Sequence, residues 1–201
     1  DVFGFPQEYK GIKLYPIKLK DSSYQDLLYQ LFGHPKNYIA NREILRTSYL
    51  KFLLYVVSGN AESTPEIYME FVREFLSHVT KVEKENILWK WKENNAEGLE
   101  AVSFQIVLNG IELEEHDIDN IREIVLEQNA SGIKYIEDFN PDLEKSLAIA
   151  NGNSSDISLT DEIFTLCALL KLSIKEVEEY TFFQFRSILE KTLILKEYDM
   201  Y

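Results

Sequence analysis

The sequence predicts a helix-rich α+β protein with a small antiparallel β-meander and a C-terminal three-helix subdomain. Two changes in the spacing of apolar residues lead to this prediction. The spacing is helical over most of residues 22–79, alternates between residues 87 and 113, and is helical again from residue 117 onward. A length of 201 residues with 45% hydrophobic content is enough to bury a sizeable core.

One strand and one helix are expected before residue 33. Residues 11–20 alternate as in a strand, and Pro16 restricts that strand to the edge of a sheet, because proline donates no backbone hydrogen bond. Residues 22–32 carry apolar side chains at helical spacing, and Gly33 ends the pattern. The first helix is therefore predicted to have about three turns.

Residues 49–57 are expected to form the central helix of the core. Eight of these nine residues are apolar or aromatic, so a helix here has almost no face for water, yet it is shorter than the about 20 residues that cross a bilayer. The helical pattern begins near Asn41. Another amphipathic helix is predicted over residues 65–79, where His78 follows Glu74 by four positions on the polar side, which indicates an exposed pair.

A β-meander is predicted after these helices. Its three strands cover residues 87–91, 99–108 and 111–113, where apolar and polar side chains alternate. Asn109 and Gly110 separate the last two strands, and this pair is the strongest short signal for a type I′ hairpin turn. A further helix is predicted over residues 117–128, with acidic residues at its N-terminal end.

The chain is expected to have three parts. Residues 1–128 form an α+β core domain, and residues 129–158 form a linker with a short helix over residues 142–150. Residues 159–201 form the C-terminal subdomain. Its helices are predicted over residues 161–172, 174–180 and 182–197, preceded by Ser158 with Asp161, Ser173 with Glu176, and Thr181 with Gln184 at capping-box spacing.

Charge is distributed unevenly along the chain. Residues 1–92 carry 13 Lys and Arg against 11 Asp and Glu, whereas residues 93–201 carry 8 against 23. The second half therefore holds a surplus of 15 negative charges. Such a surface repels nucleic acid and anionic lipid and favours a basic protein partner.

The acidic cluster of residues 112–119 allows two interpretations. A metal-dependent hydrolase gathers two or more carboxylates around its metal, and this stretch contains five acids and His116. The spacing matches no known ligand motif. We therefore expect a solvated face whose acids complement the helix dipole, with no metal, no cofactor and no catalytic residue.

Two other groups of residues are candidates for partner binding. Trp89 and Trp91 alternate with lysines and could stack on single-stranded nucleic acid, but the alternation is more typical of a strand with one buried face. Glu176, Glu178 and Glu179 belong to a predicted helix that is preceded and followed by another helix, as in a helix-turn-helix DNA-binding motif. Their negative charge argues against phosphate contact, so a DNA-binding regulator is an alternative only.

Several stretches resemble proteins encoded in the tail-morphogenesis region of phages of Gram-positive bacteria. The resemblance is carried by residues 109–129, 140–148 and 172–189, with shorter likeness at residues 9–18 and 48–53. Such proteins are described as tail assembly chaperones or virion-associated proteins. The resemblance implies contact with other proteins and transfers no catalytic residue.

The expected function is therefore non-enzymatic phage tail assembly through protein–protein contacts. The expected partners are phage tail or other virion proteins with a basic surface, self-association is left open, and neither nucleic acid nor membrane is expected as a partner. The N terminus shows no pattern of a signal peptide, so we expect the protein in the host bacterial cytoplasm or in the virion.

Overall fold

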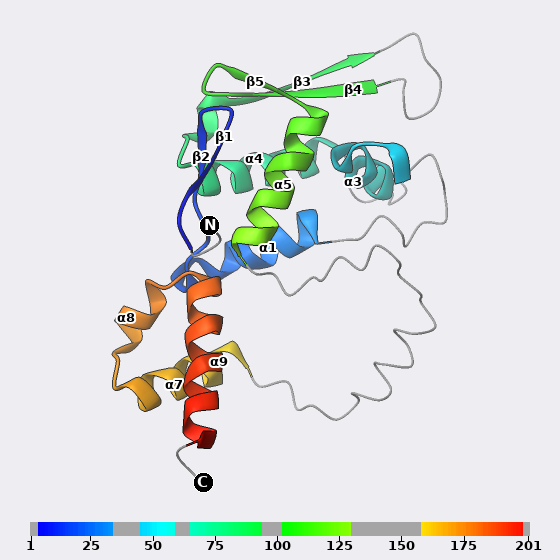
Figure 1. Cartoon of the computed structure of the whole chain (residues 1–201). Helices are drawn as coiled ribbons and strands as arrows, with labels where there is room; N and C mark the ends of the chain where they lie inside the picture. The colour runs from blue at the N-terminus through cyan, green and yellow to red at the C-terminus, as the bar shows by residue number, and fades with distance from the viewer. Residues whose placement is uncertain (1–3, 34–44, 59–64, 94–101, 130–157, 199–201) are drawn as a thin grey trace, which may run out of the picture.

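The computed structural model describes residues 4–33, 45–58, 65–93, 102–129 and 158–198. These residues form the α+β fold that the sequence predicts, rich in helix, with a three-stranded antiparallel sheet and a separate two-stranded hairpin. The sheet lies at one end of the molecule above several helices, and the C-terminal helices gather at the other end (Figure 1).

A hairpin opens the described chain. Strands β1 (Gln7–Tyr9) and β2 (Ile12–Leu14) are antiparallel, and the turn between them places both Lys10 and Gly11 at positive φ, 49° and 79°. The predicted strand over residues 11–20 is thus shorter, because beyond Leu14 other elements take its backbone groups. The N–H of Tyr15 donates to Val79 and that of Ile17 to Asn129, and a short 3-10 helix, η1 (Leu19–Asp21), follows.

Four helices pack against one another to form the core. They are α1 (Ser22–Phe32), α3 (Tyr49–Ser58), α4 (Pro65–Thr80) and α5 (Glu115–Gln128). The helical pattern predicted from near Asn41 is interrupted before α3, since Thr47 and Ser48 are not helical although Leu45 and Arg46 are. Its predicted start lies outside the described residues. The Ser48 hydroxyl instead accepts the N–H of Lys51 at 3.2 Å and begins α3 as an N-terminal cap.

The three-stranded sheet has the order β3–β4–β5. Its strands are β3 (Ile87–Glu93), β4 (Val102–Leu108) and β5 (Ile111–Glu114), and all pairs are antiparallel. Asn109 and Gly110 have φ values of 49° and 83°, as the predicted type I′ turn requires. The buried side chains of the sheet face the helices, and its opposite face holds exposed residues such as Leu88 and Glu112.

Helix α3 lies inside the core as predicted. Its residues Tyr49, Leu50, Phe52, Leu53 and Leu54 are all buried, and Lys51 is buried with them. Phe32 of α1 makes an edge contact with Phe75 of α4, with ring centres 5.4 Å apart. Aromatic rings from three helices thus fill the centre, because Phe32 also lies against Tyr49.

His78 does not form the predicted exposed pair with Glu74. Its ring is mostly buried and stacks on the ring of Tyr24, with centroids 3.7 Å apart. Glu74 instead accepts a hydrogen bond from the Tyr24 hydroxyl at 2.9 Å and pairs with Lys84. Burial, together with the nearby charge of Lys81, lowers the pKa of His78.

The C-terminal helices are α7 (Leu159–Leu170), α8 (Ile174–Glu178) and α9 (Phe182–Tyr198). Their starts use the predicted caps. The capping box of α8 is reciprocal: Ser173 accepts the N–H of Glu176 at 3.3 Å, and the Glu176 carboxylate accepts the N–H of Ser173 at 2.8 Å. The predicted short helix over residues 142–150 lies outside the described residues.

These helices share one hydrophobic core with the rest of the chain. Their buried residues, including Leu166 and Phe185, belong to the same cluster as those of α3 and α4. The N–H of Leu19 donates to Tyr180 at 3.0 Å, and the N–H of Phe182 donates to Ile17 at 3.4 Å. The predicted C-terminal subdomain is therefore attached to the N-terminal segment by backbone hydrogen bonds as well as by apolar packing.

Candidate functional site

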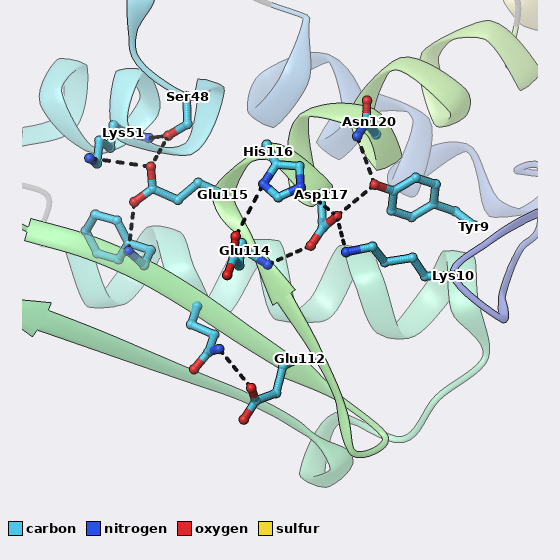
Figure 2. A network of polar contacts seen from close by, with 12 residues as sticks. Tyr9, Lys10, Ser48, Lys51, Glu112, Glu114, Glu115, His116, Asp117 and Asn120 are labelled. Carbon is cyan, nitrogen blue, oxygen red and sulfur yellow. Dashed lines mark hydrogen bonds and ion pairs between the residues drawn. The ribbon is translucent and has the colours of Figure 1, made fainter.

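The acids of residues 112–119 meet three different groups of partners, and the first centres on Asp117. Its side chain is 0% exposed and accepts hydrogen bonds from the Tyr9 hydroxyl at 2.7 Å and the N–H of Glu114 at 2.9 Å. The Lys10 ammonium lies 2.7 Å from the same carboxylate (Figure 2). Asp117 thus joins the β1–β2 turn to the start of α5.

The expectation that residues 112–119 form a solvated face is wrong for Asp117. Burial alone would raise the pKa of its carboxyl, but the hydrogen bonds from Lys10, Tyr9 and the backbone of Glu114 outweigh burial and lower the pKa. Helix α5 also begins at Glu115, two residues before the predicted start. Glu114 and Asp117 form its capping box, a pair that usually begins with Ser or Thr.

We expect Asp117→Asn to make the free energy of unfolding depend less on pH in the acidic range. Because the folded pKa lies below the ordinary 3.8, the ionised carboxylate contributes its full stability above that value and loses it as pH falls through the folded pKa. Urea unfolding midpoints measured from about pH 7 to about pH 2.5 should show the two proteins differing most at neutral pH and converging in acid. Glu123→Gln, which changes an exposed acid on the same helix, is the control. An unchanged pH profile for Asp117→Asn would show that the contacts of the Asp117 carboxylate do not stabilise the fold.

Glu115 forms the second group of contacts. Its Oε2 accepts the Ser48 hydroxyl at 2.8 Å and lies 3.5 Å from the Lys51 ammonium, while its Oε1 accepts the N–H of Phe104 at 2.8 Å. One carboxylate therefore connects the starts of α3 and α5 with strand β4 (Figure 2). The pair with Lys51 also explains how a lysine can be buried in α3.

Asp119 and Glu112 accept hydrogen bonds from other elements, α3 and β4. Asp119 accepts the N–H of Tyr49 at 2.7 Å, which places a negative charge at the N-terminal end of α3, where the helix dipole favours it. Glu112 lies on the open face of the sheet and accepts the amide of Gln105 at 3.2 Å. Among the residues that the structure describes, no three His, Cys, Asp or Glu side chains are grouped as a metal ion requires.

A polar pocket lies beside these contacts. Its volume is about 520 Å³, within the range of small-molecule sites. It opens between the start of α3, the N-terminal end of β4 and the start of α5. Its charged lining residues are Arg46, Lys51, Lys90, Glu114, Glu115, His116 and Asp119.

The two tryptophans are placed as a strand predicts. Trp89 is partly buried and packs against the hydrophobic core, while its neighbours Leu88 and Lys90 are exposed on the other face of β3. Trp91 continues the same strand, and its side chain lies outside the described part. Trp89 is thus a core-facing residue and does not offer an open stacking platform.

The acidic residues near α8 are mostly engaged within the chain. Glu176 is held in its capping box, and Glu179 lies 2.7 Å from Lys18 and 2.6 Å from Lys20, whose hydrogen bonds lower the pKa of Glu179 to about 2. Glu178 is partly exposed. Helix α8 has five residues and lies against η1, so it lacks the length and the basic charge that a recognition helix needs.

The exposed end of α9 was not predicted from the sequence. The first turns of this helix bury Phe182, Phe185 and Leu189, but the helix continues past the core. There Leu193, Ile194 and Leu195 follow one another with exposed fractions of 46%, 45% and 64%. Helical spacing could not reveal this surface, because three consecutive apolar residues face several directions at once.

No protein-family model, curated protein or solved structure matches this chain. Within the described residues, no helix combines the length and apolar character needed to span a membrane.

Proposed function

We propose that the protein is a non-enzymatic factor in phage tail assembly, or a component of the virion, that acts through contacts with other proteins. The observation that carries the protein-binding part is the apolar end of α9, formed by Leu193, Ile194 and Leu195. A helix segment that is apolar on several sides gains stability when another surface covers it. The phage assignment is supported by the resemblance of the sequence to tail-morphogenesis proteins.

The polar contacts support binding rather than catalysis. The acids of residues 112–119 are used to join α5 to the β1–β2 turn, to α3 and to β4. Glu114, Glu115 and Asp119 line one pocket, but Glu115 and Asp119 are held there by hydrogen bonds to Ser48, Phe104 and Tyr49. An enzyme that uses paired carboxylates or a metal needs them to converge on one reacting atom. The surplus negative charge of the second half favours a partner with a basic surface.

The test is capture of partners from phage-infected or induced cells with the tagged full chain. We expect tail-morphogenesis proteins among those recovered, and at least a roughly tenfold lower recovery with the double variant Ile194→Glu, Leu195→Glu, since two charges would disrupt an apolar contact. Recovery should also fall at high salt, because charge attraction to a basic partner is screened.

The matched control is the double variant Ile67→Glu, Leu88→Glu, which places the same charges at exposed apolar residues of α4 and β3. It should recover the same proteins as the unmodified chain. Recovery of proteins unrelated to the tail would contradict the phage role. A sequence-specific complex of the full chain with duplex DNA at low salt would favour the regulator alternative.

A further inference from the structure

Another pocket lies where α1 meets the C-terminal helices, which gather below α1 in Figure 1. Its volume is about 330 Å³, at the lower end of the range for small-molecule sites. Gln25 and Asp26 of α1 line one wall, and Glu162 of α7 and Arg186 of α9 line the other. A molecule bound in this pocket would therefore contact both the core helix α1 and the C-terminal helices.

Gln25 has a buried polar atom without a partner. The residue is 4% exposed, and its amide Nε2 donates to the Tyr29 hydroxyl at 3.2 Å. Its Oε1 accepts no hydrogen bond within the described part of the chain. A buried acceptor without a donor costs free energy, and most such atoms in native proteins are satisfied. Because Gln25 lines the pocket, a molecule held there is placed to supply the missing donor.

The charged residues of the lining come from three different helices. They are Asp26 on α1, Glu162 on α7 and Arg186 on α9. Among the residues that the structure describes, none of these three side chains has an ion pair or a hydrogen bond. Two negative charges and one positive charge give the lining a net charge of −1. A ligand that leaves no charge unpaired carries the reverse set, two positive charges and one negative charge.

We propose that this pocket binds a basic α-amino acid, a small molecule with one carboxylate and two cationic N–H groups. The carboxylate lies beside Arg186, because a guanidinium can donate two parallel hydrogen bonds to a carboxylate. The cationic groups lie beside Asp26 and Glu162, and one N–H donates to Gln25 Oε1. A simple anion would leave both acids unpaired, and a diamine would leave Arg186 unpaired. This site adds a small-molecule ligand to the proposed function and does not depend on it.

The test is a titration of the isotope-labelled full chain with L-arginine, agmatine and L-citrulline, followed by amide NMR shifts. Agmatine lacks the carboxylate, and citrulline has an uncharged side chain of similar length. We expect L-arginine to shift the amides of residues 25–29, 159–162 and 182–186 and to bind about tenfold more tightly than either analogue. L-arginine should also raise the thermal unfolding midpoint, because a ligand that binds only the folded state stabilises it.

Two variants assign the contacts of the ligand. Arg186→Gln should weaken the binding of L-arginine about tenfold and leave the binding of agmatine unchanged, because agmatine has no carboxylate for this residue. Gln25→Leu fills similar space without the amide and should weaken the binding of both compounds about fivefold. Far-UV circular dichroism shows that each variant is folded, and the Arg186 variant tests the site without any change in the buried part of α1.

The control is Lys191→Gln, which removes a positive charge from the same helix outside the pocket. It should bind both compounds as the unmodified chain does. Absence of shifts at millimolar L-arginine, equal affinity for the three compounds, or the same loss in Lys191→Gln as in Arg186→Gln would overturn the proposal. The capture experiment tests protein partners through the end of α9, so either experiment can fail without the other.

Discussion

Leu53→Ala is expected to lower the free energy of unfolding by about 2–5 kcal/mol, as truncations of buried leucines do. Leu53 is 3% exposed in α3, the helix whose residues fill the centre of the core. Removing its branched end leaves a cavity, because the aromatic rings of α1, α3 and α4 hold one another in place around this helix. Urea unfolding followed by far-UV circular dichroism measures the change.

The control for this variant is Leu88→Ala. Leu88 is 53% exposed on the open face of the sheet, so its truncation should change the stability by no more than about 0.5 kcal/mol. If both variants had the same unfolding midpoint as the unmodified chain, Leu53 would not be a core residue and the central position of α3 would be wrong.

Arg122→Met is expected to be the second large change, lowering stability by about 2–3 kcal/mol. The buried guanidinium donates from Nε at 3.0 Å and from Nη2 at 2.7 Å to the C=O of Phe32, which ends α1. It also lies over the ring of Tyr49, 3.8 Å from its centroid. Methionine fills similar space but leaves the carbonyl without its donors.

Arg122→Lys separates the geometry of this contact from its charge. Lysine keeps the positive charge but cannot donate from two positions in the guanidinium plane, so it should restore only part of the lost stability. Thermal or urea unfolding of the three proteins at neutral pH gives the comparison. Full stability in the lysine variant would show that the paired hydrogen bonds to Phe32 contribute nothing.

Local signals predicted most of the fold. Proline at the start of α4 and the Asn109–Gly110 turn each determine backbone geometry through the residue itself, so the sequence was sufficient. The break before α3 was missed because it does not depend on local sequence alone. A serine can lie within a helix or cap one, and at Ser48 the choice depends on Glu115, which is 67 positions away.

The candidate site was less predictable because its partners are distant in sequence. The burial of Asp117 depends on Tyr9, which is 108 positions away, and the role of Asp119 depends on the N–H of Tyr49, 70 positions away. An acidic run looks the same in sequence whether its members face water or bind different elements. Only the packing of α5 against α3 and the β1–β2 turn separates these cases.

The joining of the N-terminal segment to the C-terminal helices has a consequence for the order of folding. The contacts of Lys18 and Lys20 with Glu179 close loops of 161 and 159 residues. Closing so long a loop costs entropy that neighbouring contacts do not, so these contacts are expected to form late. During synthesis, Ile17 and Leu19 are made long before their C-terminal partners. The region around η1 thus keeps an uncovered apolar surface until the last helix leaves the ribosome.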